Sequence, residues 1–310
     1  MKLKFLLIFF ALGALFGLGV SPWLNTRPQQ VLLSPVSQIE AYSEPETDTQ
    51  SQSNVTETGK TIDSYFAYFD HEQNKLLASN PSEIPQVLGA ETSSHSGHST
   101  IAVFGDSMTD TMGTNLPYLA SALESYYPNM DFDLLNYGIG SQNVTQGLAR
   151  VTQNYSYQDR NYPPITQANA DLIIVESFAY NPLDASEIGT YQQNLSSLLS
   201  QLKNSNAKVV FLATIAPLKS KFGQGPGGVN WDQDTAWNHA TKIQSFLEAG
   251  LATASNLGIP TLDLYHATLQ DNGEGIASLV STHDGIHPSV AGHTYIAQQL
   301  AAYILKNQLL

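Results

Sequence analysis

The sequence predicts an α/β domain built on a parallel sheet, and three observations point to this fold class. Five short apolar runs recur through the last two thirds of the chain, and they contain many β-branched and aromatic residues. Longer amphipathic stretches separate these runs. About 210 residues remain for this part, which suits a single domain of the class. Strands that alternate with helices form parallel sheets, and the helices cover both faces of such a sheet.

The predicted elements follow one another from residue 100 to the end of the chain. The apolar runs are 100–105 (TIAVFG), 132–137 (FDLLNY), 171–176 (DLIIVE), 208–215 (KVVFLATI) and 259–264 (IPTLDL). The helix-like stretches lie near 115–127, 142–155, 186–203, 233–257 and 289–306. Ligands of open parallel sheets bind beyond the carboxyl ends of the strands, so the residues after each run are the functional candidates.

Residues 1–24 have the pattern of a membrane-targeting segment. Lys2 and Lys4 precede an uncharged stretch, 5–24, whose apolar run has no polar face. A helix of this length would span about 30 Å, so a retained single-pass anchor is feasible. A cleaved signal peptide is the alternative, although no clear Ala-x-Ala site follows, and a buried soluble helix is the least favoured. Anchored or secreted, the rest of the chain is expected to be extracytoplasmic.

Residues 25–98 are expected to form a low-complexity linker. This stretch is rich in Ser, Thr, Gln, Glu and Pro and lacks sustained periodicity. It therefore cannot bury enough apolar area to offset the entropy lost on ordering. The exception is 62–77 (IDSYFAYFDHEQNKLL), whose aromatics could form a short helix resting on the next domain; a lid or substrate-contacting arm, or no ordered structure, are the alternatives. The domain itself is predicted at 99–310.

Composition excludes several classes of function. The chain has 13 basic and 27 acidic residues, for a formal net charge of −14. Binding to a nucleic-acid backbone requires clustered Lys and Arg, and the sequence has no such cluster. The absence of cysteine removes thiolate nucleophiles, disulfides and thiolate metal sites.

Polar side chains follow the predicted strands where each strand ends. The first run ends in GDS at 105–107, the second in NYGIGS at 136–141 and the third in SFAYN at 177–181, while DGIHP at 284–288 precedes the last helix. Together they supply a hydroxyl, an imidazole to take its proton, a carboxylate to orient that ring and donors for an oxyanion. Each motif alone is weak, and their shared placement at one edge of the sheet is what discriminates.

These blocks resemble those of the SGNH, or GDSL, hydrolase family, in particular its thioesterase and lysophospholipase members. GDSMTD at 105–110 is similar to the first block, NYGIGSQNVTQGLAR at 136–150 to the second, and DGIHP at 284–288 to the last. The third block departs from the family pattern Gly-x-Asn-Asp, because this chain has AYNP at 179–182. The resemblance implies the SGNH hydrolase fold, a three-layer α/β/α domain with a five-stranded parallel flavodoxin-like sheet.

The residue types and the resemblance imply the same roles. Ser107 would attack an acyl carbonyl after His287 takes its proton, and Asp284 would hold the imidazole. The predicted oxyanion donors are the backbone amides of Ser107 and of either Gly140 or Ser141, together with the Asn181 side chain. The predicted pocket residues are Phe178, Tyr180 and His283. This mechanism calls for no metal and no organic cofactor.

The expected function is a monomeric serine esterase that cleaves an ester or thioester of a small molecule, a lipid or an O-acylated glycan, with the membrane as a further partner. An acyltransferase that delivers the acyl group to a sugar is one alternative, and a non-catalytic binding domain of the same fold is another. The glycine-rich stretch 223–231 (GQGPGGVNW) is either a mobile lid or a plain connector.

Overall fold

A computed structural model describes residues 92–310 of the chain. The predicted membrane segment at 1–24, the short helix at 62–77 and most of the predicted linker lie outside the described residues. Among residues 92–310, no helix combines the length and the hydropathy that a membrane crossing requires. The first strand begins at Gly97, two residues inside the range predicted as linker.

A five-stranded parallel sheet forms the centre of the domain, in the order β2-β1-β5-β6-β7. The strands are β1 (Gly97–Gly105), β2 (Met130–Gly138), β5 (Leu172–Glu176), β6 (Lys208–Ala213) and β7 (Thr261–Asp263). All five predicted strands are confirmed, and so is the parallel sheet. The strand order reverses direction at β1, and the carboxyl edge beside that switch point is where such sheets bind ligands.

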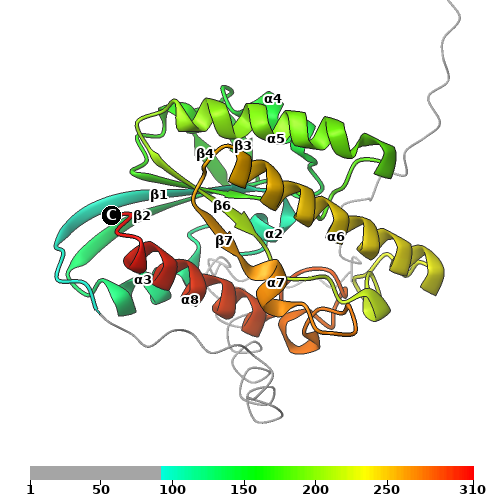
Figure 1. Ribbon diagram of the computed structural model, residues 1–310. Helices are drawn as coiled ribbons and strands as arrows, with labels where there is room; N and C mark the ends of the chain where they lie inside the picture. Colours follow the sequence, from blue (N-terminus) through cyan, green and yellow to red (C-terminus); the bar gives the residue numbers. More distant parts are fainter. Residues whose placement is uncertain (1–91) are drawn as a thin grey trace, which may run out of the picture. The chain divides into compact units, whose positions relative to one another are not determined.

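Helices cover both faces of the sheet, as the alternating pattern predicts. Helices α4, α5 and α6 pack side by side on one face, and α3 packs against α8 on the other (Figure 1). The longer helices are α3 (Pro117–Tyr126), α4 (Val144–Arg150), α5 (Ile188–Lys203), α6 (Gln233–Asn256) and α8 (Val290–Lys306). The short ones are α2 (Ser107–Asp110) and α7 (Leu264–Thr268), with 3₁₀ turns at Ile165–Gln167, Ala185–Glu187, Lys219–Lys221 and Ala277–Leu279.

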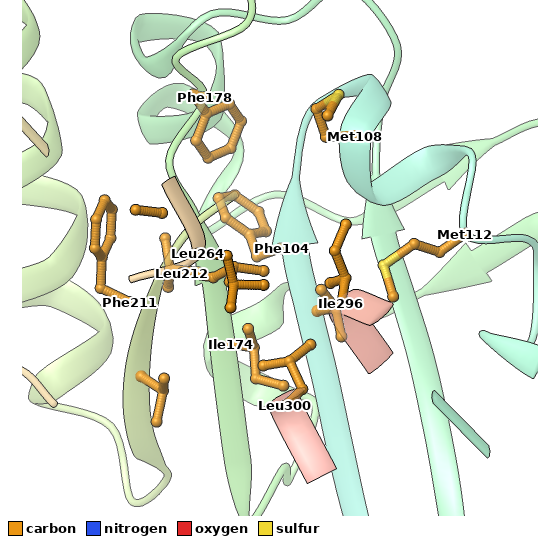
Figure 2. Close-up of a cluster of buried hydrophobic side chains, with 14 of the residues drawn as sticks. Phe104, Met108, Met112, Ile174, Phe178, Phe211, Leu212, Leu264, Ile296 and Leu300 are labelled. Carbon is orange, nitrogen blue, oxygen red and sulfur yellow. The ribbon is translucent and has the colours of Figure 1, made fainter. Parts of the chain in front are cut away.

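The core lies on both sides of the central strands. The residues Ile101–Phe104 of β1 and Leu172–Val175 of β5 are all buried, because helices cover both faces of these strands and leave no solvated side. Figure 2 shows Phe104, Ile174, Leu212, Ile296 and Leu300 meeting in this core. Figure 2 also shows Met108 and Phe178 close to the carboxyl ends of β1 and β5, so apolar packing anchors the turns that leave these strands.

The structure differs from the prediction after α4. A helix is predicted over 142–155, but α4 ends at Arg150, and a two-stranded hairpin follows, formed by β3 (Tyr155–Tyr157) and β4 (Arg160–Tyr162). The alternation of tyrosines with polar residues suits a strand better than a helix. Gln158 makes the turn with a left-handed φ of 54°. The hairpin's tyrosine rings pack against Tyr137 of β2, which fixes it beside the carboxyl end of that strand.

Candidate active site

The turn after β1 holds Ser107 at the start of a helix. Asp106 caps α2, since its Oδ1 accepts a hydrogen bond from the Met108 amide at 2.9 Å. Gly105 leaves no room for a side chain: a Cβ there would lie 2.2 Å from the Thr109 hydroxyl oxygen and 2.7 Å from the Glu176 Cβ. The chain therefore turns sharply from strand to helix, and it presents Ser107 half-exposed at the carboxyl edge of the sheet.

Asp284 and His287 form a hydrogen-bonded pair in the loop before α8. Asp284 Oδ2 lies 2.7 Å from His287 Nδ1, while Asp284 Oδ1 accepts from the amides of Ile286 at 2.8 Å and His287 at 3.0 Å. Burial opposes ionisation of Asp284, but the hydrogen bond and charge of His287 and the two amides outweigh it, so the pKa is lowered. The carboxylate stays ionised and fixes the ring through Nδ1, which leaves Nε2 for another partner.

The charge of His287 acts on the two carboxyl groups at the ends of α2. It lowers the pKa values of Asp106 and Asp110, which lie on either side of Ser107 in the chain, although burial raises both values overall. Within residues 92–310, the structure has no hydrogen bond between the Ser107 hydroxyl and the His287 ring. Apo enzymes often hold such partners apart until substrate arrives, so the arrangement is compatible with proton transfer.

The loop after β2 brings two candidate amide donors to the same edge. The Ile139 amide donates to the Gly105 carbonyl at 3.2 Å, which ties this loop to the serine turn. Within the described residues, the amides of Gly140 and Ser141 donate to no other backbone group, so both are available to an oxyanion. Ser141 has a left-handed φ of 60°, and a Cβ on Gly140 would lie 3.1 Å from the Tyr157 hydroxyl.

Asn181 reaches the site from the loop after β5. Its Nδ2 donates to Asp106 Oδ2 at 2.9 Å, so the side-chain amide lies directly beside the serine turn. An asparagine amide carries two N–H groups, and the second is available to an oxyanion. Asn181 thus stays close to Ser107 even though the surrounding AYNP sequence departs from the usual third block.

The predicted pocket residues differ in exposure. Phe178 is fully buried, with its ring edge-on to Phe104 at a centroid distance of 5.6 Å. Tyr180 is also buried, and its hydroxyl donates to the Ile215 carbonyl at 3.0 Å. His283 is exposed beside the Asp284–His287 loop. Phe178 and Tyr180 therefore support the site from the core, and contact of any of the three with substrate stays a prediction.

Arg150 is the last residue of the QGLAR motif, and the sequence analysis predicted no role for it. Its Nη2 donates to the Gly105 carbonyl at 2.8 Å, and its Nε donates to Gln142 Oε1 at 2.7 Å. The guanidinium lies 4.0 Å from the centre of the Phe104 ring, and burial lowers its pKa to about 10. Arg150 thus ties α4 to the end of β1, one residue before Asp106.

The β3–β4 hairpin braces the loop after β2, and the alternation of tyrosines with polar residues at 155–162 is its weak signal in the sequence. Arg160 is buried, pairs with Asp110 and donates to the Asn136 carbonyl at 3.2 Å. Tyr155 donates to the Gly138 carbonyl at 2.7 Å. The hairpin therefore holds the last residues of β2 and the last residue of α2 in one network, directly before the candidate oxyanion amides.

The glycine-rich stretch 223–231 packs on the loop that carries the acid and the base. The Gly227 amide donates to the His283 carbonyl at 2.9 Å, and a Cβ on Gly227 would lie 2.1 Å from His283 Nε2. On the other side of the contact, a Cβ on Gly285 would lie 2.0 Å from the Lys221 carbonyl. Glycine is therefore required on both sides of this contact, against the His283 ring at Gly227 and against the Lys221 carbonyl at Gly285. Within residues 92–310, no group of three His, Asp or Glu side chains is placed to hold a metal ion.

A serine, a histidine–aspartate pair and several amide donors meet at the carboxyl edge of a parallel α/β sheet, which is an arrangement used by serine hydrolases. A sequence model of the GDSL-like lipase/acylhydrolase family matches residues 103–295, more than half of the chain. The chain belongs to this family of hydrolases that act on esters.

Solved structures with a similar fold include a lipase/acylhydrolase from Enterococcus faecalis. It shares 16% identity, with 67% of this chain and 96% of that chain covered and a TM-score of 0.47. A catalytic mutant of an acetylxylan esterase from Geobacillus stearothermophilus shares 15% identity, with coverage of 71% and 96% and a TM-score of 0.47. No curated protein matches the chain by sequence.

Proposed function

We propose that this protein is a serine esterase that works through Ser107, His287 and Asp284. The observation that carries the proposal is the hydrogen bond between Asp284 and His287, which fixes the imidazole through Nδ1 and leaves Nε2 for the Ser107 proton. The charge of His287 also acts on both Asp106 and Asp110, between which Ser107 lies in the chain. A base that is oriented by a half-buried carboxylate, together with a serine on a strand-to-helix turn, is the pair of groups that activates a hydroxyl nucleophile.

The reaction proceeds in two halves. His287 Nε2 takes the Ser107 proton as Oγ attacks the carbonyl carbon, and the carbonyl electrons move to the oxygen, where amide donors stabilise the negative charge. The tetrahedral intermediate collapses, the imidazolium gives its proton to the leaving alkoxide or thiolate, and an acyl-serine remains. Water then attacks with His287 as base, and the acid is released as Ser107 regains its proton.

Three groups are assigned to the oxyanion site. These are the Ser107 amide, the amide of Gly140 or Ser141, and the side chain of Asn181. Loss of one such donor typically lowers kcat by about 10²- to 10³-fold, so Asn181→Ala should reduce turnover by that factor. The backbone donors cannot be removed by a side-chain substitution.

The experiment uses the full chain, a p-nitrophenyl acetate assay and a serine-directed fluorophosphonate. We expect turnover and stoichiometric labelling, both lost in Ser107→Ala and greatly reduced in His287→Ala. His266→Ala is the matched control, because His266 Nδ1 lies 2.7 Å from Asp263 Oδ2, the same distance as in the Asp284–His287 pair, but is exposed to solvent. A folded wild-type chain that neither turns over nor labels would refute the esterase.

The proposal also covers where the enzyme acts and which class of ester it cleaves. Residues 1–24 support an extracytoplasmic enzyme that is membrane-anchored or secreted, and the 25–98 stretch would let the domain reach surrounding ester groups. O-acyl groups on lipids or cell-surface glycans are therefore the proposed substrates. A panel of esters across acyl lengths separates them, and N-terminal sequencing of the membrane-associated protein shows whether the first segment is retained.

A further inference from the structure

Two carboxyl side chains that the esterase mechanism does not use are buried together beneath the serine turn. Asp106 and Glu176 are 0% and 1% exposed. The Asp106 amide lies 3.5 Å from Glu176 Oε2, and each carboxyl group influences the pKa of the other. Carboxyl groups are rarely buried without a partner, so each must have its charge compensated or carry a proton.

The surrounding groups decide which acid carries the proton. Burial, followed by the charge of Asp106, raises the pKa of Glu176 well above its ordinary value. Burial also raises the pKa of Asp106, but Asp106 accepts from the Met108 amide, from Asn181 and from Glu176, and the charge of His287 favours its ionised form. Two adjacent carboxylates cannot both ionise here. The surroundings therefore favour the proton on Glu176 and the negative charge on Asp106.

We propose that Asp106 is a positioning residue that fixes the Asn181 amide as an oxyanion donor, and that Glu176, as a neutral acid, holds Asp106 in place for this task. The inference rests on the proposed esterase function. It assigns a role to an aspartate that otherwise only caps a four-residue helix.

The chemistry of the contact explains why an anion is needed. A carboxylate only accepts hydrogen bonds, so Asp106 Oδ2 forces Asn181 to turn its NH₂ group, and not its carbonyl, toward the serine turn. One N–H of Asn181 is held by Asp106. Because the amide group is planar, this hydrogen bond also fixes the direction of the second N–H. An amide free to flip would present its carbonyl oxygen to the developing oxyanion for part of the time, which would repel that charge.

Both carboxyl oxygens of Glu176 accept hydrogen bonds from the residues that follow it. Ser177 Oγ donates to Glu176 Oε1 at 2.6 Å, and the Phe178 amide donates to Glu176 Oε2 at 3.0 Å. Phe178 adopts a left-handed φ of 56° at the start of the segment that leads to Asn181. Glu176 thus holds both the aspartate and the beginning of the Asn181 loop.

A double-mutant cycle between Asp106 and Asn181 tests the proposal. Asp106→Asn keeps an acceptor for the Met108 amide but places an NH₂ group against that of Asn181. We expect this variant to lower kcat for p-nitrophenyl acetate by about 10- to 100-fold with little change in KM, against about 10²- to 10³-fold for Asn181→Ala. In the Asn181→Ala background, Asp106→Asn should cost less than about threefold, because its target is gone. Multiplicative effects of the two substitutions would overturn the proposal.

Glu176 is tested by a conservative and a disruptive variant. Glu176→Gln keeps a donor for Asp106, so we expect kcat within about threefold of wild type and an unmoved acidic limb of the kcat/KM–pH profile. Glu176→Met lacks the donor and should behave like Asp106→Asn. A shifted acidic limb in Glu176→Gln, or full activity in Glu176→Met, would contradict the role of Glu176.

The controls separate this proposal from the esterase itself. If Glu176→Met does not fold, the Asp106/Asn181 cycle and Glu176→Gln still decide the outcome. An inactive wild-type chain would refute the esterase, whereas an active wild type with independent, multiplicative effects of Asp106 and Asn181 would refute only the positioning role.

Discussion

His293 should make the domain acid-labile, and His293→Phe should remove that sensitivity. The ring is 5% exposed in α8, stacks on Tyr118 at a centroid distance of 5.3 Å, and has no hydrogen-bond partner for Nδ1. Burial, followed by the charge of His287, lowers its pKa to about 3. An unfolded histidine has a pKa of about 6.5, so between these values only the unfolded state binds the proton.

The size of the effect follows from this difference. Stability is complete above about pH 6.5 and falls with decreasing pH by up to about 1.4 kcal/mol per pH unit, until the folded state also binds the proton near pH 3. At pH 5 the loss is about 2 kcal/mol, and it depends almost entirely on the unfolded pKa, because the folded histidine is still neutral there. A folded pKa one unit higher would hardly change this figure.

Urea unfolding of wild type and His293→Phe at pH 7.5 and pH 5 measures the effect. Phenylalanine keeps an aromatic ring against Tyr118, and any cost of its larger size is the same at both pH values. We expect the difference in unfolding free energy between the two proteins to change by about 2 kcal/mol in favour of the variant at pH 5. Parallel pH dependences of wild type and variant would show that His293 does not titrate as its burial requires.

Three further substitutions test the packing around the site. Arg160→Leu leaves the carboxylate of Asp110 without its charged partner, so we expect a loss of about 3–5 kcal/mol in urea unfolding, and a loss under 1 kcal/mol would show that the ion pair is not the main restraint. Tyr155→Phe removes the hydrogen bond to the Gly138 carbonyl and should cost about 1 kcal/mol by the same measurement, whereas no loss would mean that water replaces the hydroxyl. Gly138→Ala would place a Cβ 2.3 Å from the Asp110 amide and should lower both melting temperature and turnover. Gly189→Ala, at a helical position with nothing within 4 Å, is its control and should be neutral or stabilising, so equal behaviour of the two variants would contradict the steric argument.

The strands were predictable because buried parallel strands are continuously apolar, and such runs stand out from amphipathic helices. The β3–β4 hairpin was not predictable from the sequence, because its three-residue strands are too short to show a clear period. Its stability comes from contacts with Tyr137 and Asn136 on a distant strand. Tertiary contact, and not local propensity, decides the structure of residues 151–162.

Spacing alone could not single out the acid–base pair. Asp263 and His266 have the same three-residue spacing as Asp284 and His287 and form an equally short hydrogen bond. The fold separates the two pairs. Asp284 and His287 lie in the loop before α8 near the serine turn, whereas Asp263 and His266 lie on the surface, where His266 also contacts Glu248. Asp263 and His266 also follow a predicted strand, 259–264, so the resemblance of DGIHP at 284–288 to the last block of the family was the informative signal.

The contact between Asp106 and Asn181 was equally hidden, because 75 residues separate the two side chains along the chain. Glu176 ends the apolar run DLIIVE, where a charged residue at a strand end normally faces solvent. Its burial depends on Asp106 and on Ser177, so no local pattern could have revealed that this carboxyl lies in the interior.

The contacts between the glycine-rich loop and the Asp284–His287 loop couple the positions of these two segments. The Gly227 amide donates to the His283 carbonyl and Gly227 lies against the His283 ring, while Gly285 lies against the Lys221 carbonyl. Opening of residues 223–231 as a lid would therefore break the contacts that hold them against the residues beside Asp284. A displacement of that loop would also disturb the loop that carries His287, the proposed base, so we expect access to the site and alignment of the base to change together.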